Sequence, residues 1–93
     1  MPGIIRITDL CSGHDGYHRV QNVSASPNTF TNMIPVVRYG DSRGVHSCYG
    51  LSHSAVNLGL HNVIVNSRSI QTGSDPTSCG SIQDQCSRNT YVN

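Results

Sequence analysis

The sequence predicts a small all-β fold, built from short strands and hairpins in a pseudo-threefold layout. The first observation is a pattern that occurs three times: an asparagine, a β-prone triplet and a second asparagine. The copies cover residues 28–32, 62–66 and 89–93 and contain the triplets TFT, VIV and TYV. β-branched and aromatic residues favour strands, and asparagine favours the turns beside them. The second observation is that no long helical periodicity separates the copies, so the fold is expected to consist of strands and turns.

Each copy belongs to a larger unit that runs from a strand through a turn into a second strand, and then into a loop that begins with aspartate. The unit at 28–41 continues as MIPVVRYGD, and the unit at 62–75 continues as SRSIQTGSD. The offset of 34 residues between them persists from the first asparagine to the aspartate. Residues 4–9, IIRITD, form a truncated copy. Internal repeats of this kind predict repeated structural units.

The chain is short and poor in large apolar residues. It has 93 residues, a net charge of +1 and 21 Leu, Ile, Val and Phe residues in all. This length fits one domain, 1–93, expected to carry no N- or C-terminal extension. A core this thin barely offsets chain entropy of roughly 1–2 kcal/mol per residue, so a disulfide, a metal or a partner should add stability. No secretory signal is visible, which favours thiols or metal ligands over disulfides for the four cysteines.

The loops that follow the three aspartates each contain a soft metal ligand at nearly the same distance. Histidine follows by five residues or cysteine by four, in the pairs Asp9 and His14, Asp41 and His46, and Asp75 and Cys79. In a threefold arrangement equivalent positions face one axis, so these three ligands are expected to converge. His53, seven residues after His46, is the expected fourth ligand, and Cys48 is an alternative for that position.

Three histidines and one cysteine suit a tetrahedral structural zinc ion, because nitrogen and sulfur donors match this borderline-soft metal. Four protein ligands close the coordination sphere and leave no open position for catalysis. The alternative is that these histidines are ordinary loop residues, but it offers no reason why equivalent loops share ligand types. The aspartates are expected to accept hydrogen bonds from amides of their own loops. His61 falls at a turn position that is expected to face solvent.

Four stretches resemble a known family. They are HDG at 14–16, SPNTFTNMIPVVRYGD at 26–41, GSDPTSCG at 73–80 and SRNTYVN at 87–93. Together they resemble the PAAR-repeat family, the conical proteins at the tips of central spikes in contractile phage tails and type VI secretion systems. The resemblance covers essentially the whole chain. The namesake Pro-Ala-Ala-Arg reads Pro-Val-Val-Arg at 35–38, and the family's Asn-Gly turns read Asn-Met at 32–33 and Asn-Ser at 66–67.

The resemblance implies a conical fold with one structural zinc near its apex. The family's three histidines and one cysteine carry over onto His14, His46, His53 and Cys79. The resemblance also implies a partner, the blunt end of a trimeric β-helical spike, on which one chain sits as a cap. It further implies a place at the tip of the tail spike in the virion, transient contact with the host outer membrane, and no enzymatic activity.

The docking face for such a spike is expected to contain apolar strand residues, with Val36, Val37, Ile64 and Val65 as candidates. A zinc-binding adaptor that attaches cargo or an effector to a spike is an alternative function, and a small zinc hydrolase is a remote one. No paired carboxylates or phosphate-binding glycine loop favours an enzyme. The chain has no lysine and its arginines are scattered, which gives no charge footprint for nucleic acid.

Overall fold

The computed structural model describes residues 3–13, 19–48 and 51–92, with the side chains of 46–53 outside that description. Its strands are β1 (Phe30–Thr31), β2 (Ile34–Pro35), β3 (His46–Cys48), β4 (Leu51–His53), β5 (Ile64–Val65) and β6 (Arg68–Ser69). They pair as three antiparallel hairpins, β1–β2, β3–β4 and β5–β6. The described ranges contain no helix, and therefore none long and apolar enough to cross a membrane. The expected all-β class is confirmed.

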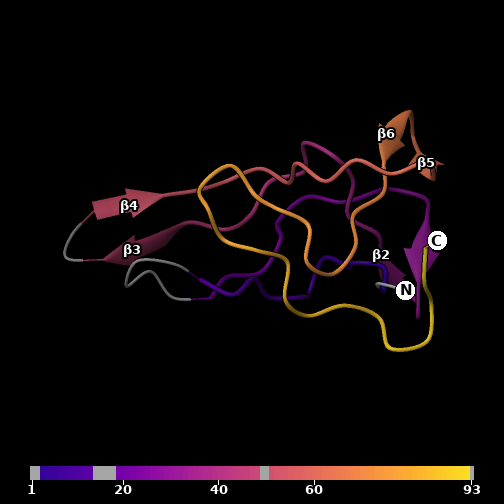
Figure 1. Ribbon diagram of the computed structural model, residues 1–93, viewed down its shortest axis with the longest axis horizontal. Coiled ribbons are helices and arrows are strands. Elements are labelled where there is room, and N and C mark those ends of the chain that lie inside the picture. Colours follow the sequence, from indigo (N-terminus) through magenta and orange to yellow (C-terminus); the bar gives the residue numbers. More distant parts are fainter. Residues whose placement is uncertain (1–2, 14–18, 49–50, 93) are drawn as a thin grey trace.

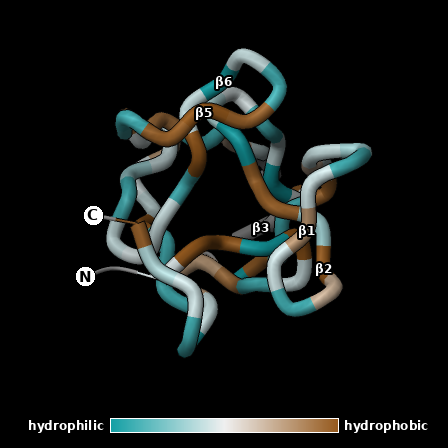
Figure 2. The backbone as a smooth tube through the Cα atoms, turned by 90° about the vertical axis from the view of Figure 1, so that its right-hand side faces the viewer, coloured by the Kyte–Doolittle hydropathy of each residue, from teal (hydrophilic) through white to brown (hydrophobic). Residues whose placement is uncertain are grey.

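The molecule is elongated, with extents of 37 × 23 × 22 Å along its principal axes. Figure 1 shows β3–β4 at one end of the long axis, which we call the narrow end. The labelled strands β2, β5 and β6 lie at the opposite end, which we call the broad end. Seen along this axis, β1–β2, β5–β6 and the two chain termini occupy three separate corners of the broad end (Figure 2). At the third corner Gly3 and Tyr91 form an isolated antiparallel bridge.

The β1–β2 and β5–β6 hairpins share one turn geometry. Both central residues of each turn have positive φ: 53° and 65° at Asn32 and Met33, and 51° and 66° at Asn66 and Ser67. Positive φ at both positions defines the type I′ turn, whose twist matches that of the flanking strands. Glycine would adopt the second position at lower steric cost, but the turn keeps its geometry with methionine and serine there.

A closed ring of backbone hydrogen bonds joins three distant segments inside the molecule. Ile5 N donates to Gln71 O at 2.9 Å, Gln71 N to Val37 O at 3.1 Å, and Val37 N to Ile5 O at 3.0 Å. None of these three residues has exposed surface. The apolar cluster of the core is small and consists of Ile4, Val36, Val65, Ile70 and Val92. Hydrogen bonds between distant segments therefore supplement a limited apolar core.

Polar groups fill much of the interior. Fourteen buried polar or charged residues accompany ten buried apolar residues in the described part of the chain. Buried polar atoms normally require hydrogen-bond partners, and among those described only Arg43 Nε and Ser81 Oγ have none. The fold thus depends on satisfied polar contacts where a larger domain would bury more apolar surface.

Candidate metal centre

The β3–β4 hairpin carries two of the four predicted metal ligands. Its register pairs His46 with His53 and Cys48 with Leu51. Directly opposed residues of an antiparallel pair share one face, and their Cβ atoms are generally about 4.5–5.5 Å apart. The register therefore places His46 and His53 opposite each other on the hairpin. Cys48 is two residues from His46 along β3, so it shares that face and stays an alternative fourth ligand.

Cys79, the predicted sulfur ligand, is half-buried in a loop that is hydrogen-bonded to the chain leaving β4. Its Sγ atom lies 3.5 Å from Thr77 Oγ1. Immediately before it, Ser78 N donates to Val56 O at 3.0 Å. Because Val56 stands three residues after His53, this bond holds the cysteine loop beside the segment that carries a predicted histidine ligand.

His14 lies outside the described residues, but the segment before it is described. Ser12 N donates to Ile82 O at 2.9 Å, and Cys11 N donates to Val20 O at 3.1 Å. The first bond joins the chain before His14 to the segment that follows the Cys79 loop. The second joins the two flanks of the stretch that contains His14. The backbone therefore draws the neighbourhoods of the predicted ligands together.

Among the described side chains no group of three or more His, Cys, Asp or Glu residues is arranged to hold a metal ion. The side chains of His14, His46 and His53 fall outside that description, so the predicted four-ligand set stays a prediction. Its chemistry fits zinc, since three imidazole nitrogens and one thiolate sulfur make a closed tetrahedral shell. Hydrogen bonds of the described backbone hold the segments that carry these ligands close to one another.

The three aspartates that open the ligand loops cap the turns that lead into those loops. Each Oδ2 atom accepts the amide of the residue three positions earlier at 2.7–2.8 Å, in the pairs Asp9 and Arg6, Asp41 and Arg38, and Asp75 and Thr72. In the first two loops the arginine side chain adds a bidentate ion pair with the same carboxylate. The carboxylates therefore bind backbone amides as expected, but these amides belong to the preceding turn and not to the loop that follows each aspartate.

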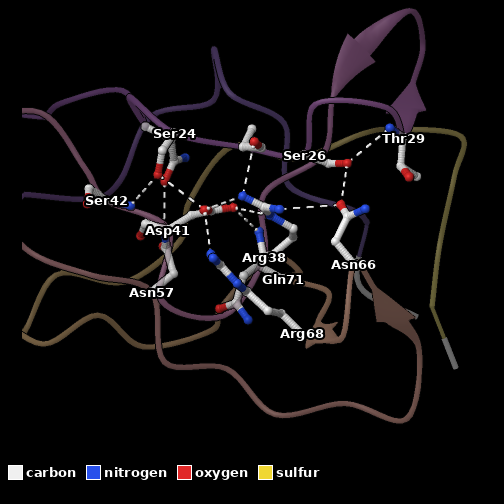
Figure 3. A network of polar contacts seen from close by, with 12 residues as sticks. Ser24, Ser26, Thr29, Arg38, Asp41, Ser42, Asn57, Asn66, Arg68 and Gln71 are labelled. Atoms are coloured by element: carbon white, nitrogen blue, oxygen red, sulfur yellow. Dashed lines mark hydrogen bonds and ion pairs between the residues drawn. The ribbon is translucent and has the colours of Figure 1, made fainter.

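Asp41 is the centre of a wider network (Figure 3). Its Oδ1 atom accepts hydrogen bonds from Arg38 Nη2 at 2.9 Å, from Ser24 Oγ at 3.2 Å and from Arg68 Nη1 at 3.2 Å. The Asp41 side chain is 1% exposed. The hydrogen bonds between Arg38 and Asp41 raise the pKa of Arg38 above the ordinary arginine value. Arg38 Nη1 also reaches Asn66 Oδ1 at 3.3 Å, so the loop is joined to the β5–β6 turn.

The third aspartate loop is closed by a histidine that the sequence interpretation placed in solvent. His61 Nε2 lies 2.7 Å from Asp75 Oδ2 and 3.1 Å from Thr72 Oγ1, and the His61 side chain is 21% exposed. Gly59 permits this approach, because a Cβ atom there would lie 2.2 Å from Asp75 Oδ2. The solvent-facing prediction for His61 is wrong. One sequence feature could have indicated this contact. Thr72 stands where the other two units have Arg6 and Arg38, so Asp75 lacks an arginine partner in its own turn.

A buried polar network between the ligand-carrying segments also escaped prediction. Arg43 is 2% exposed, and its Nη1 atom donates to Val20 O at 3.0 Å while Nη2 donates to Gln83 Oε1. Gln83 Nε2 in turn donates to Asn57 Oδ1, and Asn57 Nδ2 donates to Asn22 Oδ1 at 2.8 Å. No sequence signal identified these residues, because arginine, glutamine and asparagine are usually exposed.

Three of the four residues predicted for a docking face lie in the core. Val36, Val37 and Val65 are 1%, 0% and 8% exposed, so they support the fold and are removed from any surface that a partner contacts. Ile64 is 58% exposed and stays a candidate. Ile64 and Val65 are consecutive in β5, and consecutive strand residues point to opposite faces.

A scan against models of protein families and a search of curated proteins both gave no match for this chain. Its function is therefore inferred from geometry and donor chemistry. Two regions carry that inference: the apolar side chains exposed at the broad end, and the joined loops that lead to the narrow end.

Proposed function

We propose that this protein is a non-enzymatic tip that caps and sharpens the trimeric β-helical central spike of a contractile tail, in a phage baseplate or a type VI-like machine. In this proposal the broad end docks on the blunt end of the spike, and the narrow end points outward. One chain sits on three spike chains at the tip of the tail in the virion. It meets the host outer membrane when the spike pierces the cell envelope.

The observation that carries the proposal is a set of three exposed apolar side chains, two on strands of the broad end and one at the bridge between Gly3 and Tyr91. Phe30, Ile64 and Tyr91 are 55%, 58% and 48% exposed. Each is the middle residue of one Asn–triplet repeat, and the residue after it in each triplet is buried. We call these three residues the broad-end triad. Large apolar side chains that stay exposed at equivalent positions of three repeats suit contact with a partner that offers three equivalent sites.

A pseudo-threefold layout would match a trimeric partner, and the backbone hydrogen bonds support it. In each repeat, the carbonyl group of the first triplet residue accepts a hydrogen bond from a distant amide at 2.9–3.0 Å. The donor and acceptor pairs are Ile4 and Thr90, Val36 and Thr29, and Ile70 and Val63. The central ring of Ile5, Val37 and Gln71 repeats one relation three times. A chain with three similar corners can contact three equivalent sites of a closed trimer and cover its open strand edges.

The proposed zinc site, with His14, His46, His53 and Cys79 as ligands, belongs to the narrow end. Few side chains can pack at such a point, so apolar burial contributes little there. Metal binding contributes roughly 10–16 kcal/mol to folding in small zinc domains, which is enough to hold loops together at a vertex. A closed set of four protein ligands fits a structural role and a mechanical action, in which the rigid end concentrates force on the membrane.

Binding to purified spike fragments tests the proposal. Trimeric β-helical fragments from phage spikes and type VI spikes are mixed with the chain, and the complexes are weighed by light scattering. We expect one chain per trimer, and Ile64→Asp should weaken binding about tenfold or more, because it places a charge in an apolar contact. Val23→Asp is the matched control, since Val23 is 62% exposed outside the broad-end triad. Equal binding by both variants, or binding to no trimeric fragment, would contradict the docking role.

A further inference from the structure

Arg43 is a buried cation placed between the segments on which the predicted metal ligands lie. It stands three residues before His46, and it is 2% exposed. Its guanidinium donates to Val20 O, beyond the stretch that contains His14, and to Gln83, four residues after Cys79. One side chain thus joins three parts of the chain that lie far apart in sequence.

The network continues to the fourth ligand-carrying segment. Gln83 Nε2 donates to Asn57 Oδ1, and Asn57 stands four residues after His53. Asn57 Nδ2 also donates to Asp41 O at 2.7 Å and to Asn22 Oδ1 at 2.8 Å. Gln83, Asn57 and Asn22 are 1%, 0% and 3% exposed. Each predicted ligand therefore has, within six residues of it in sequence, a group that hydrogen-bonds in this network.

The charge of Arg43 is unusual for its surroundings. Among the described residues no carboxylate forms an ion pair with it, and its Nε atom has no hydrogen-bond partner. Burial lowers the pKa of Arg43, whereas the proximity of Cys11, Cys79 and Asp9 acts in the opposite direction. Removing a charge from water without an ion-pair partner is unfavourable, and an apolar side chain of similar size often serves stability as well as a buried charge.

We infer that Arg43 is a positioning residue for the metal centre, holding the segments that carry His14, His46, His53 and Cys79 in place before a metal ion binds. The inference rests on the proposed zinc site and concerns the residues behind it. Groups that hydrogen-bond to metal ligands and orient them commonly change metal affinity by 10–100-fold, and Arg43 acts one step further away, through residues near the ligands in sequence. A planar guanidinium is suited to this task, because it directs several N–H groups to separate acceptors in a fixed geometry.

Zinc titration of four purified proteins tests the inference. Zn²⁺ is added to the chelator-treated chain in competition with a chromogenic chelator, for wild type, Arg43→Met, Arg88→Met and Cys79→Ser. We expect wild type to bind about one zinc ion and Cys79→Ser to lose most of that affinity. Arg43→Met should bind zinc about 10–100-fold more weakly. Arg88→Met should match wild type, since Arg88 is exposed and its side chain has no hydrogen-bond partner among the described residues.

A second measurement separates positioning from a general loss of stability. The thermal unfolding midpoint is recorded for each protein in chelator and in zinc. A merely structural role would lower both midpoints of Arg43→Met equally and leave its zinc affinity unchanged, which would overturn the inference. Positioning should instead shrink the stabilisation that zinc provides. Wild type that binds no zinc would overturn the proposed metal site itself, so the two failures are distinguishable.

Two further variants keep the inference testable if Arg43→Met does not fold. Arg43→Lys keeps the charge but cannot reach both acceptors with a rigid fork, so its zinc affinity should fall between those of wild type and Arg43→Met. Gln83→Met leaves Arg43 its bond to Val20 and removes the link to the Cys79 side. It should weaken zinc binding as well. Wild-type affinity in both folded variants would overturn the inference.

Discussion

The units at 26–41 and 60–75 have the same backbone structure and different side-chain contacts. Their hairpin registers coincide at the offset of 34 residues: Phe30 pairs with Pro35 as Ile64 pairs with Ser69. Both turns have the same pair of positive φ angles, and both aspartate loops have the same amide–carboxylate bond. The main-chain geometry is therefore conserved between the units although most of the side chains differ.

The difference begins four residues before the first strand of each unit, at Ser26 in one unit and Leu60 in the other. Ser26 Oγ accepts the amide of Thr29 at 3.0 Å and donates to Asn66 Oδ1 at 2.6 Å, which joins the two hairpins. The equivalent residue of the other unit is Leu60, which is 78% exposed and cannot form these bonds. There, His61 N donates to Ser69 Oγ at 2.7 Å instead. The two units therefore share their turn geometry and strand register, whereas the side-chain hydrogen bonds that stabilise each unit differ.

The largest expected effect comes from the arginine-fastened loop. Arg38→Met leaves Asp41, whose side chain is 1% exposed, without its bidentate partner. We expect a loss of about 3 kcal/mol in unfolding free energy, because among the described residues the buried Asp41 charge then keeps only the half-exposed Arg68 as a cationic partner. Urea unfolding measures it. Arg68→Met is the control, since Arg68 contacts the same carboxylate with a side chain 47% exposed and should cost less than about 1 kcal/mol. Equal losses would contradict this ranking.

A smaller effect is expected in the histidine-fastened loop. His61→Ala removes the 2.7 Å contact with Asp75, but that carboxylate keeps the Thr72 amide and hydroxyl. We expect a loss of about 1–2 kcal/mol, as for a hydrogen bond to a charged group, in the same urea experiment. Pro27→Ala changes the equivalent, exposed position of the other unit and should cost less than about 1 kcal/mol, because it only adds conformational freedom to the unfolded chain. If His61→Ala cost no more than Pro27→Ala, the Asp75 loop would depend on its backbone cap alone.

The smallest effect is expected at the turns, where the units are most alike. Met33→Gly and Ser67→Gly should each stabilise the protein by roughly 0.5 kcal/mol, because relief of left-handed strain exceeds the added entropy of the unfolded chain. Met33 is 95% exposed and loses no packing. Differential scanning calorimetry should resolve a small rise in melting temperature. Thr29→Gly, at a residue without positive φ, should lower it, and a fall in the turn variants would show that the turns are unstrained.

The sequence by itself determined the features that depend on neighbouring residues. The Asn–triplet–Asn pattern predicted turns at 32–33 and 66–67, and the offset of 34 residues predicted two units with one backbone. The aspartates were predicted to cap amides of their own loops, and the structure shows them capping the turns just before those loops. The all-β class followed from the absence of helical periodicity. Apart from this shift of the caps, the local predictions agree with the structure. These predictions are confirmed because turns, caps and strand propensity act within a few residues. The four-ligand zinc site, inferred from repeat phase, stays a prediction.

The tertiary structure decided what depends on contacts between distant segments. It buried Val36, Val37 and Val65 and exposed Ile64, because the direction in which each strand residue points depends on what packs against it. It also brought Arg43 to Gln83, which lies 40 residues away in sequence. A short repeat fixes the local path of the chain. Only closure of the fold around its hydrogen-bonded centre determines which of those side chains meet, since the core is too small for apolar pattern alone to specify them.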